Sequence, residues 1–283
     1  MKITYIGHAT VLIEIGGKRI LTDPNFDPRL GWFLPRVSAP GIGLANLPKL
    51  DMILLTHAHA DHLSFASLRT IRDVPLYAPP PVARWIRQRG FTHTFDLEVG
   101  DELTVGNLSV KVGRALHAGN RYGVDRWRQQ SNMYLLSTKY ESAFFAGDTA
   151  LSPTTTHMVE EALRKDGRTL DIALLPIGYA PWWRPGFRKG HLTSWDALTL
   201  FERLEARYFI PYHWGTFRHV TSTPYSAIRE LREHVISHTR GSDVRVLEPG
   251  EAFHMEESMH SDRVSAEQPG AQPRVGDDIR GSG

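Results

Sequence analysis

Residues 54–64 of this chain read Leu-Leu-Thr-His-Ala-His-Ala-Asp-His-Leu-Ser, and four side chains of the kinds that bind metal ions fall within six positions. His57, His59 and Asp61 alternate along the chain, so in an extended segment they point to the same side. His62 can turn to a different face as the chain leaves the strand. Imidazole nitrogen and carboxylate oxygen suit zinc and related divalent ions. One such run can supply ligands to two adjacent ions.

A strand is predicted over residues 50–56, because residues 52–55 are apolar and lead directly into this cluster. The alternative interpretation is a polar surface turn after a buried strand. We favour metal binding, because gathering four such side chains at the end of a buried strand is costly when nothing binds them.

Strands and helices alternate through the rest of the chain, which is typical of a layered α/β protein. Strands are predicted first over residues 2–7, 10–15 and 18–22, with Gly16-Gly17 as a hairpin turn. Further strands are predicted over residues 75–78, 132–137, 142–146, 171–176 and 208–212, and residues 94–113 alternate in strand fashion with turns at Gly100-Asp101 and Gly106-Asn107. Residues 244–247 and 252–254 are expected to close the core. Helices are predicted over residues 64–72, 81–89, 157–165, 194–204 and 225–235.

Three more residues with metal-binding side chains follow predicted strands, namely His117, Asp148 and His213. Gly147 stands directly before the carboxylate and permits a close approach of the backbone. Loops at strand ends can vary on a rigid base, so active sites of α/β proteins gather there. We therefore expect these residues to meet the cluster that follows residue 56.

The ordered set, with Asp148 in the form Gly-Asp-Thr, resembles the metallo-β-lactamase superfamily of hydrolases. The resemblance implies a four-layer αββα sandwich, formed as a single domain by residues 1–254, with a two-metal site between the sheets. Carried over to this chain, the ligands of that site are His57, His59 and His117 for one metal, Asp61, His62 and His213 for the other, and Asp148 as the bridge.

Further motifs are similar to the branch of N-acylphosphatidylethanolamine-hydrolysing phospholipase D-like enzymes. They read Gly-His-Ala-Thr-Val-Leu-Ile-Glu at 7–14, Leu-Thr-Asp-Pro at 21–24, Phe-Phe-Ala-Gly-Asp-Thr at 144–149 and His-Trp-Gly-Thr-Phe at 213–217. The similarity implies hydrolysis of a phosphodiester, for which an N-acyl phospholipid is a candidate. A related branch contains lactonases, so hydrolysis of a lactone or another carboxyl ester on the same site is the alternative. A metal-binding or sensor protein without turnover is a third interpretation, and the full ligand set argues against it.

Two metal ions about 3.5–4 Å apart clamp the oxygens of an in-line displacement and lower the pKa of bound water to about 7. The predicted nucleophile is the resulting hydroxide. Zinc is the expected metal, and manganese, iron and cobalt suit the same ligands. Asp61 is expected to bind metal and also to orient the hydroxide.

Three further residues are candidates for supporting roles. His191 falls where the family it resembles has a histidine near the metals, so it is the candidate acid for the leaving group or a donor to the developing oxyanion. A purely structural role for His191 is the alternative. His8 and Asp23 are predicted either to fix the orientation of histidine ligands or to make ordinary hydrogen bonds at tight turns.

The loops at residues 25–48, 119–128 and 179–191 are predicted to shape the substrate site. The last of them carries Trp182, Trp183, Arg184, Arg188 and Lys189. Arginine binds phosphate through two hydrogen bonds, and tryptophan supplies apolar area. These residues suit an anionic small molecule or lipid, with peripheral membrane contact for a lipid. A solvated loop with packed tryptophans is the alternative.

The composition fits a globular protein, since 41% of the 283 residues are hydrophobic and can bury a sizeable core. The net charge of +2 does not indicate a nucleic-acid partner. The N-terminus lacks the apolar core of a signal peptide, the chain has no transmembrane-length apolar run, and it contains no cysteine. We therefore expect a cytoplasmic protein. Residues 255–283 are polar and are expected to form a disordered tail.

Overall fold

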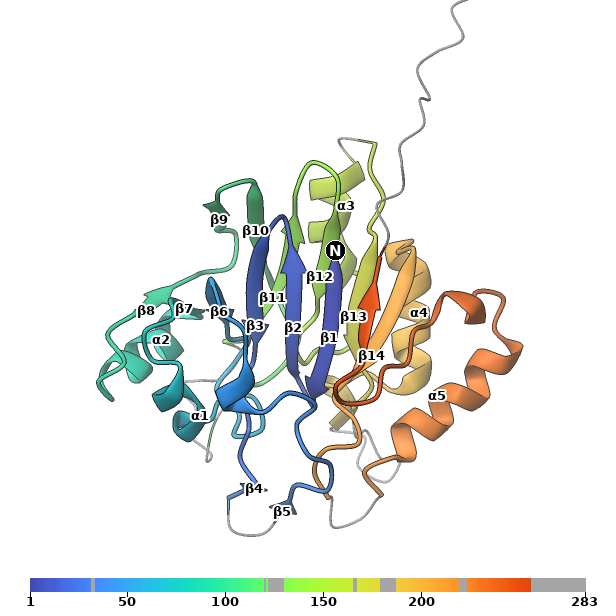
Figure 1. Ribbon diagram of the computed structural model, residues 1–283. Helices are drawn as coiled ribbons and strands as arrows, with labels where there is room; N and C mark the ends of the chain where they lie inside the picture. Colours follow the sequence, from blue (N-terminus) through green and yellow to red (C-terminus); the bar gives the residue numbers. More distant parts are fainter. Residues whose placement is uncertain are drawn as a thin grey trace, which may run out of the picture.

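Two β-sheets form the middle of the molecule, one behind the other in Figure 1. The computed structural model describes residues 1–31, 34–119, 121, 130–164, 167–178, 187–218 and 223–255. The first sheet has the strand order β15 (Ala252–His254), β1 (Lys2–Gly7), β2 (Thr10–Ile15), β3 (Lys18–Thr22), β6 (Met52–Leu54), β7 (Leu76–Ala78) and β8 (Thr94–Asp96). The second has the order β14 (Tyr208–Tyr212), β13 (Ile172–Pro176), β12 (Ser142–Phe145), β11 (Asn132–Ser137), β10 (Leu108–Arg114) and β9 (Glu102–Val105). A separate small hairpin consists of β4 (Arg29–Leu30) and β5 (Leu34–Pro35).

Local sequence explains the first hairpin. Gly16 and Gly17 have φ values of 58° and 74°, which a two-residue hairpin turn with positive φ at both positions requires. The strands on either side pair antiparallel, with Ile15 opposite Lys18. From β3 to β8 the pairing becomes parallel, because the connections now pass through helices or loops.

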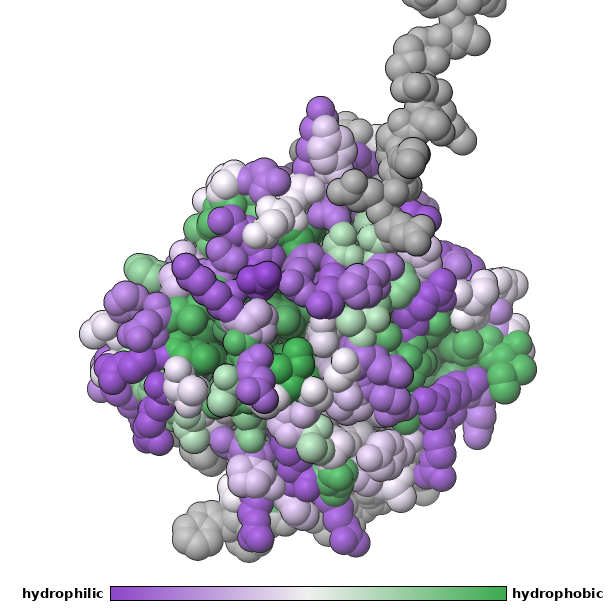
Figure 2. Space-filling model, in the orientation of Figure 1, coloured by the Kyte–Doolittle hydropathy of each residue, from purple (hydrophilic) through white to green (hydrophobic). Residues whose placement is uncertain are grey.

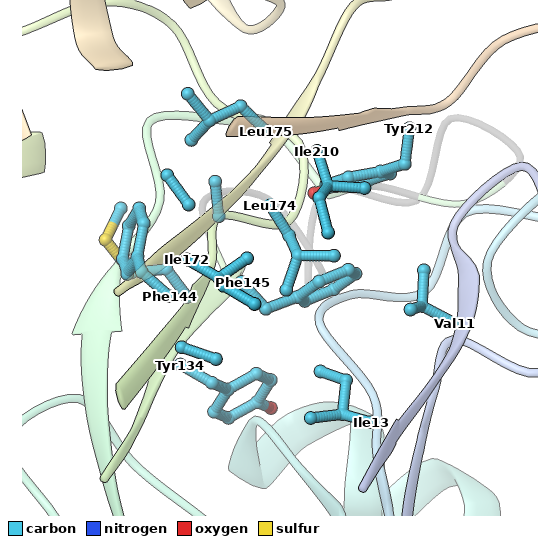
Figure 3. Packing of buried hydrophobic residues seen from close by; sticks show 14 of the residues in the cluster. Val11, Ile13, Tyr134, Phe144, Phe145, Ile172, Leu174, Leu175, Ile210 and Tyr212 are labelled. Atoms are coloured by element: carbon cyan, nitrogen blue, oxygen red, sulfur yellow. The ribbon is translucent and has the colours of Figure 1, made fainter. Parts of the chain in front are cut away.

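The core lies between the two sheets, where apolar side chains from both meet (Figure 3). Successive side chains of a strand point to opposite faces. Accordingly, Val11 and Ile13 of β2 face the second sheet, whereas Leu12 belongs to a different cluster on the other face. Burying one such side chain contributes about 1.5–3 kcal/mol to stability, so this alternation fixes which face of β2 is inside.

Helices cover the outer faces of both sheets. On the first sheet lie α1 (Phe65–Thr70) and α2 (Pro80–Arg87). With the second sheet lie α3 (Thr154–Leu163), α4 (Ser194–Leu204) and α5 (Ser226–Ser237). The outer cluster of the first sheet joins the helical residues Leu68, Val82 and Ile86 to the strand residues Leu12 and Ile53. Short 3-10 helices span Leu44–Asn46, Phe187–Lys189 and Gly241–Asp243. The predicted four-layer αββα sandwich is confirmed.

The structure confirms some details of the sequence predictions and corrects others. The turns predicted at Gly100 and Gly106 are present, and they divide residues 94–113 among β8, β9 and β10. Residues 244–247 close the core as expected: Val244 forms a bridge with Phe209, and Leu247 is buried in the cluster between the sheets. Met255, placed in the predicted tail, is buried and donates its N–H to the carbonyl of Met1. Residues 256–283 lie outside the described residues, so a disordered tail there stays a prediction.

The face of the molecule drawn in Figure 2 carries mostly hydrophilic residues, with hydrophobic patches between them. Among the described residues, no helix has both the length and the apolar character needed to cross a membrane.

Candidate metal centre

Seven histidines and two carboxylates meet where strands of both sheets end. His8 follows β1, the run from His57 to His62 follows β6, and His213 follows β14. His117 and Asp148 follow β10 and β12, and His191 comes shortly before α4. Because these elements belong to both sheets, the site lies between the sheets.

Two groups of potential metal ligands form at this edge. We call His57, His59, His117 and Asp148 the first cluster, and His8, Asp61, His62 and His213 the second cluster. Within each cluster, the ligand atoms all lie within 4.8 Å of one another. The structure thus brings together all seven residues predicted as metal ligands, and it adds His8 to the second cluster.

Asp148 lies between the two clusters and is 1% exposed. Its Oδ2 is 3.3 Å from His62 Nε2 and 3.9 Å from His117 Nε2, and its Oδ1 is 3.4 Å from His213 Nε2. Gly147 makes this placement feasible: its φ is 60°, and a Cβ there would lie 2.8 Å from the carbonyl oxygen of Asn132. One carboxylate can therefore reach histidines of both clusters.

Three histidine rings of the two clusters are held in place by contacts to their Nδ1 atoms. His57 Nδ1 lies 2.9 Å from Thr56 Oγ1, and His62 Nδ1 lies 2.7 Å from Asp23 Oδ2. His117 Nδ1 lies 2.8 Å from the carbonyl oxygen of Gly190. Such partners fix the tautomer and orientation of a histidine, so the Nε2 atoms point toward Asp148.

The inward-facing atoms fit a bound cation. Among the buried side-chain atoms that have no hydrogen-bond partner are Nε2 of His57, His62 and His213, and Oδ1 of Asp148. A buried polar group without a partner costs about 1–3 kcal/mol. Divalent cations would satisfy these atoms together, and imidazole with carboxylate is a suitable donor set for zinc.

The three histidines of the first cluster resist protonation. Burial, reinforced by the neighbouring His62 and His59, lowers the pKa of His57 well below its usual value. Burial likewise lowers the pKa of His117 to about 3, although the nearby Asp148 partly opposes this. The pKa of His59 is also lowered, mainly by burial. At neutral pH these rings are uncharged and can act as ligands.

The second cluster holds charged groups. Burial alone would lower the pKa of His213, but Asp148 and Asp61 outweigh it and raise that pKa to about 9. The same carboxylates raise the pKa of His62 well above its usual value against the effect of burial. Burial would raise the pKa of Asp61 and of Asp148, but the histidines around them lower both well below the usual range. The charged groups of the second cluster and Asp148 therefore form a network of ion pairs.

The backbone around the site is strained. Four non-glycine residues in the described parts of the chain have positive φ, and three of them, His8, Asp23 and His213, belong to this region. Their φ values are 56°, 36° and 69°. The fourth, Glu205, ends α4. Strained conformations persist where surrounding contacts hold them, and they concentrate at functional sites.

His191 lies beside Asp148 and is partly exposed. Its Nε2 is 3.5 Å from Asp148 Oδ2, its side chain is 19% exposed, and its ring centroid is 4.8 Å from that of His117. The histidine that the sequence singled out therefore lies beside the predicted ligands and also faces solvent.

The predicted substrate loops are described in part. Arg188 is exposed and donates to Asp196 of α4 at 3.3 Å, so its charge is already paired. Lys189 is exposed. Trp182, Trp183 and Arg184 lie outside the described residues, as do residues 32–33 and most of 119–128.

Sequence reasoning missed three contacts that hold His57, His117 and the loop at residues 57–63. These are the Thr56 hydroxyl, the Gly190 carbonyl and the guanidinium of Arg121, which donates to the carbonyls of Ala58 and Leu63 at 3.1 and 2.9 Å. Two of the three involve main-chain carbonyls, which every residue type has, so no residue pattern could have indicated them.

Comparison with known proteins supports this picture. Residues 18–214 match the family model described as "Beta-lactamase superfamily domain". The N-acyl-phosphatidylethanolamine-hydrolyzing phospholipase D 1 of Caenorhabditis elegans is 28% identical over 247 residues, covering 80% of this chain and 67% of that protein. A metal-dependent hydrolase of Flavobacterium johnsoniae is 27% identical over 256 residues, covering 90% of this chain and 100% of that protein.

Among solved structures, an isothiocyanate hydrolase from Delia radicum gut bacteria is similar with a TM-score of 0.74 and 22% identity. The match covers 90% of this chain and 99% of that one. At this identity the likeness shows a shared fold.

Proposed function

We propose that this chain, which belongs to the beta-lactamase superfamily, is a metal-dependent hydrolase that holds two divalent ions and cleaves a phosphodiester. The observation that carries the proposal is the set of buried histidine nitrogens, free of hydrogen bonds, that surround Asp148. The similarity to the phospholipase of Caenorhabditis elegans supports the choice of a phosphodiester and makes an N-acyl phospholipid a candidate substrate.

The proposed ligands of the first ion are the histidines of the first cluster. Those of the second ion are Asp61, His62 and His213, with Asp148 shared between the two ions. Zinc is the proposed metal, and manganese, iron and cobalt suit the same donors. Two divalent ions at this position would activate water and stabilise the negative charge that develops on the attacked phosphate.

The protein side chains would supply the remaining steps. His191 is the proposed proton donor for the leaving oxygen, because its ring lies beside Asp148 and is also accessible to solvent. General acid catalysis of this kind contributes about 10²–10⁴-fold to a rate. Lys189, exposed two residues before His191, is the proposed group that attracts an anionic substrate.

The test is a substrate screen on protein whose metal content has been measured. We expect hydrolysis of bis(p-nitrophenyl) phosphate and of an N-acyl phospholipid presented in mixed micelles, loss of both activities after chelation, and recovery with zinc. If the protein hydrolyses lactones and none of the phosphodiesters, the proposed substrate class changes from a phosphodiester to a carboxyl ester. A preparation that holds two ions and hydrolyses none of these substrates would contradict an enzymatic role.

A further inference from the structure

His8 lies between two residues proposed as ligands of the second ion. Its Nε2 is 2.9 Å from Asp61 Oδ2. Its carbonyl oxygen accepts a hydrogen bond from the N–H of His213 at 3.0 Å, and the two ring centroids are 3.9 Å apart. One residue on the turn between β1 and β2 therefore contacts both an acidic and a basic member of the second cluster.

The partner of the His8 ring indicates which nitrogen carries the proton. An ionised carboxylate only accepts hydrogen bonds, so Nε2 of His8 must donate to Asp61. The other nitrogen, Nδ1, is buried and has no hydrogen-bond partner. An Nε2 atom that carries a proton has no lone pair left for a metal ion. His8 is near enough to be a ligand, but its hydrogen bond assigns it a different role.

The surroundings of His8 hold it rigidly. Its N–H donates to the hydroxyl oxygen of Tyr5 at 3.0 Å, and that hydroxyl donates to the carbonyl of Trp214 at 2.9 Å. The edge of the ring meets Phe217, with centroids 5.1 Å apart. The residue also keeps a φ of 56°, which a histidine adopts only when its contacts enforce it.

We infer that His8 is a positioning residue that orients the Asp61 carboxylate toward the second metal ion. Asp61 Oδ2 lies 3.5 Å from His213 Nε2 and 3.8 Å from His62 Nε2, so this oxygen faces the other proposed ligands. A carboxylate oxygen has two lone pairs. One accepts the N–H of His8, and the other stays free for a cation. The inference rests on the proposed metal site and adds a residue that the predicted ligand set does not contain.

A pair of variants matched in size tests this role. In His8→Gln the side-chain amide keeps an N–H donor near the position of Nε2, whereas His8→Met has a similar length and no donor. Both variants remove the imidazole. Each is treated with a chelator and titrated with zinc against a competing chelator, and cobalt(II) absorption spectra report the coordination of the bound ions.

We expect His8→Met to bind the second ion about 10–100-fold more weakly, which is the usual effect of losing a hydrogen-bond partner of a metal ligand. The affinity of His8→Gln for the second ion should stay within a few-fold of the wild-type affinity, and its cobalt spectrum should be unchanged. An equal loss in both variants, with a changed cobalt spectrum, would identify His8 as a ligand and overturn the inference. Unchanged second-ion affinity in His8→Met would overturn it as well.

Two controls separate the possible failures. Thermal unfolding of the metal-free variants shows whether a substitution destabilises the fold independently of metal. If His8→Met does not fold, the test rests on His8→Gln, and weakened binding of the second ion by folded His8→Gln contradicts the inference. Wild-type protein that binds no second ion would instead refute the proposed two-metal function, leaving the two failures distinguishable.

Discussion

His57 and His117 of the first cluster are held by uncharged partners, a hydroxyl and a carbonyl, whereas His62 of the second cluster is held by the carboxylate of Asp23. The difference extends to protonation. Burial keeps the histidines of the first cluster neutral, while carboxylates raise the pKa of His62 and of His213.

The comparison indicates two ways of preparing a metal site inside a protein. The first cluster offers neutral ligands already aligned by the fold. The second balances its buried charges internally, so cations entering it must displace protons. Asp148 belongs to both arrangements, because its oxygens approach His62, His117 and His213.

Asp148→Asn would remove what the two clusters share. We expect loss of both ions and a fall in hydrolysis of at least about 10²–10³-fold, which is the effect of losing one electrostatic contact in a closed site. Elemental analysis and assay of the purified variant provide the measurement. The exposed Asp73→Asn serves as a control of equal chemistry. If Asp148→Asn retains two ions and near-normal activity, Asp148 is not a shared ligand of the two ions.

His59→Ala and His213→Ala would separate the clusters. Each variant should lose one ion and its activity while keeping the other ion. His59→Ala should keep the second site, whose protonated histidines release protons when metal binds. His213→Ala should keep the first site, whose histidines are already neutral and release none. Calorimetric titration with zinc in two buffers of different ionisation enthalpy measures this. Full activity in either variant would contradict the ligand assignment.

His191→Ala should leave both ions bound, because no ligand is removed. We expect turnover of substrates with poor leaving groups to fall about 10²-fold, while a p-nitrophenolate leaving group, which needs no proton, is affected much less. The ratio of the two rates in variant and wild type is the measurement. Equal slowing of both substrates would show that His191 is structural.

The pH dependence of metal affinity should also distinguish the two clusters, with a smaller effect than the substitutions have. In the metal-free protein the pKa of His213 is about 9, so near pH 7 this ring is protonated and must lose its proton to bind a cation. Affinity for the second ion should therefore rise about tenfold per pH unit for each proton released between pH 7 and 9, and should fall as the pH is lowered. Affinity for the first ion should change little in that range, because the pKa values of His57 and His117 are lowered. Parallel curves for both ions would contradict the comparison.

The ligands themselves could be predicted from the sequence, because closely spaced histidines and carboxylates directly after apolar runs are typical of a metal site. The layered fold followed from the alternation of strands and helices. The supporting contacts could not be predicted in the same way. Gly190 meets His117 across 73 positions of the chain, and a Cβ on this glycine would lie 2.9 Å from His117 Nδ1. Such a contact depends on the final approach of two loops and leaves no periodic pattern.

His8 shows the same limit for a side chain. In the sequence, His8 suits either the orientation of a histidine ligand or an ordinary hydrogen bond at a tight turn. The folded chain brings its ring 2.9 Å from the carboxylate of Asp61. The motif at residues 7–14 supported the family resemblance, but it did not distinguish a residue that binds metal from one that orients a ligand.

The central claim is that two ions, one in each cluster, make the hydrolytic site. The most direct measurement is a titration of chelator-treated protein with zinc, in which hydrolysis of bis(p-nitrophenyl) phosphate is followed as each equivalent is added. We predict that activity reaches its maximum at two ions per chain, with the second ion releasing protons as it binds. Full activity at one ion per chain, or no activity at any metal content, would contradict the claim.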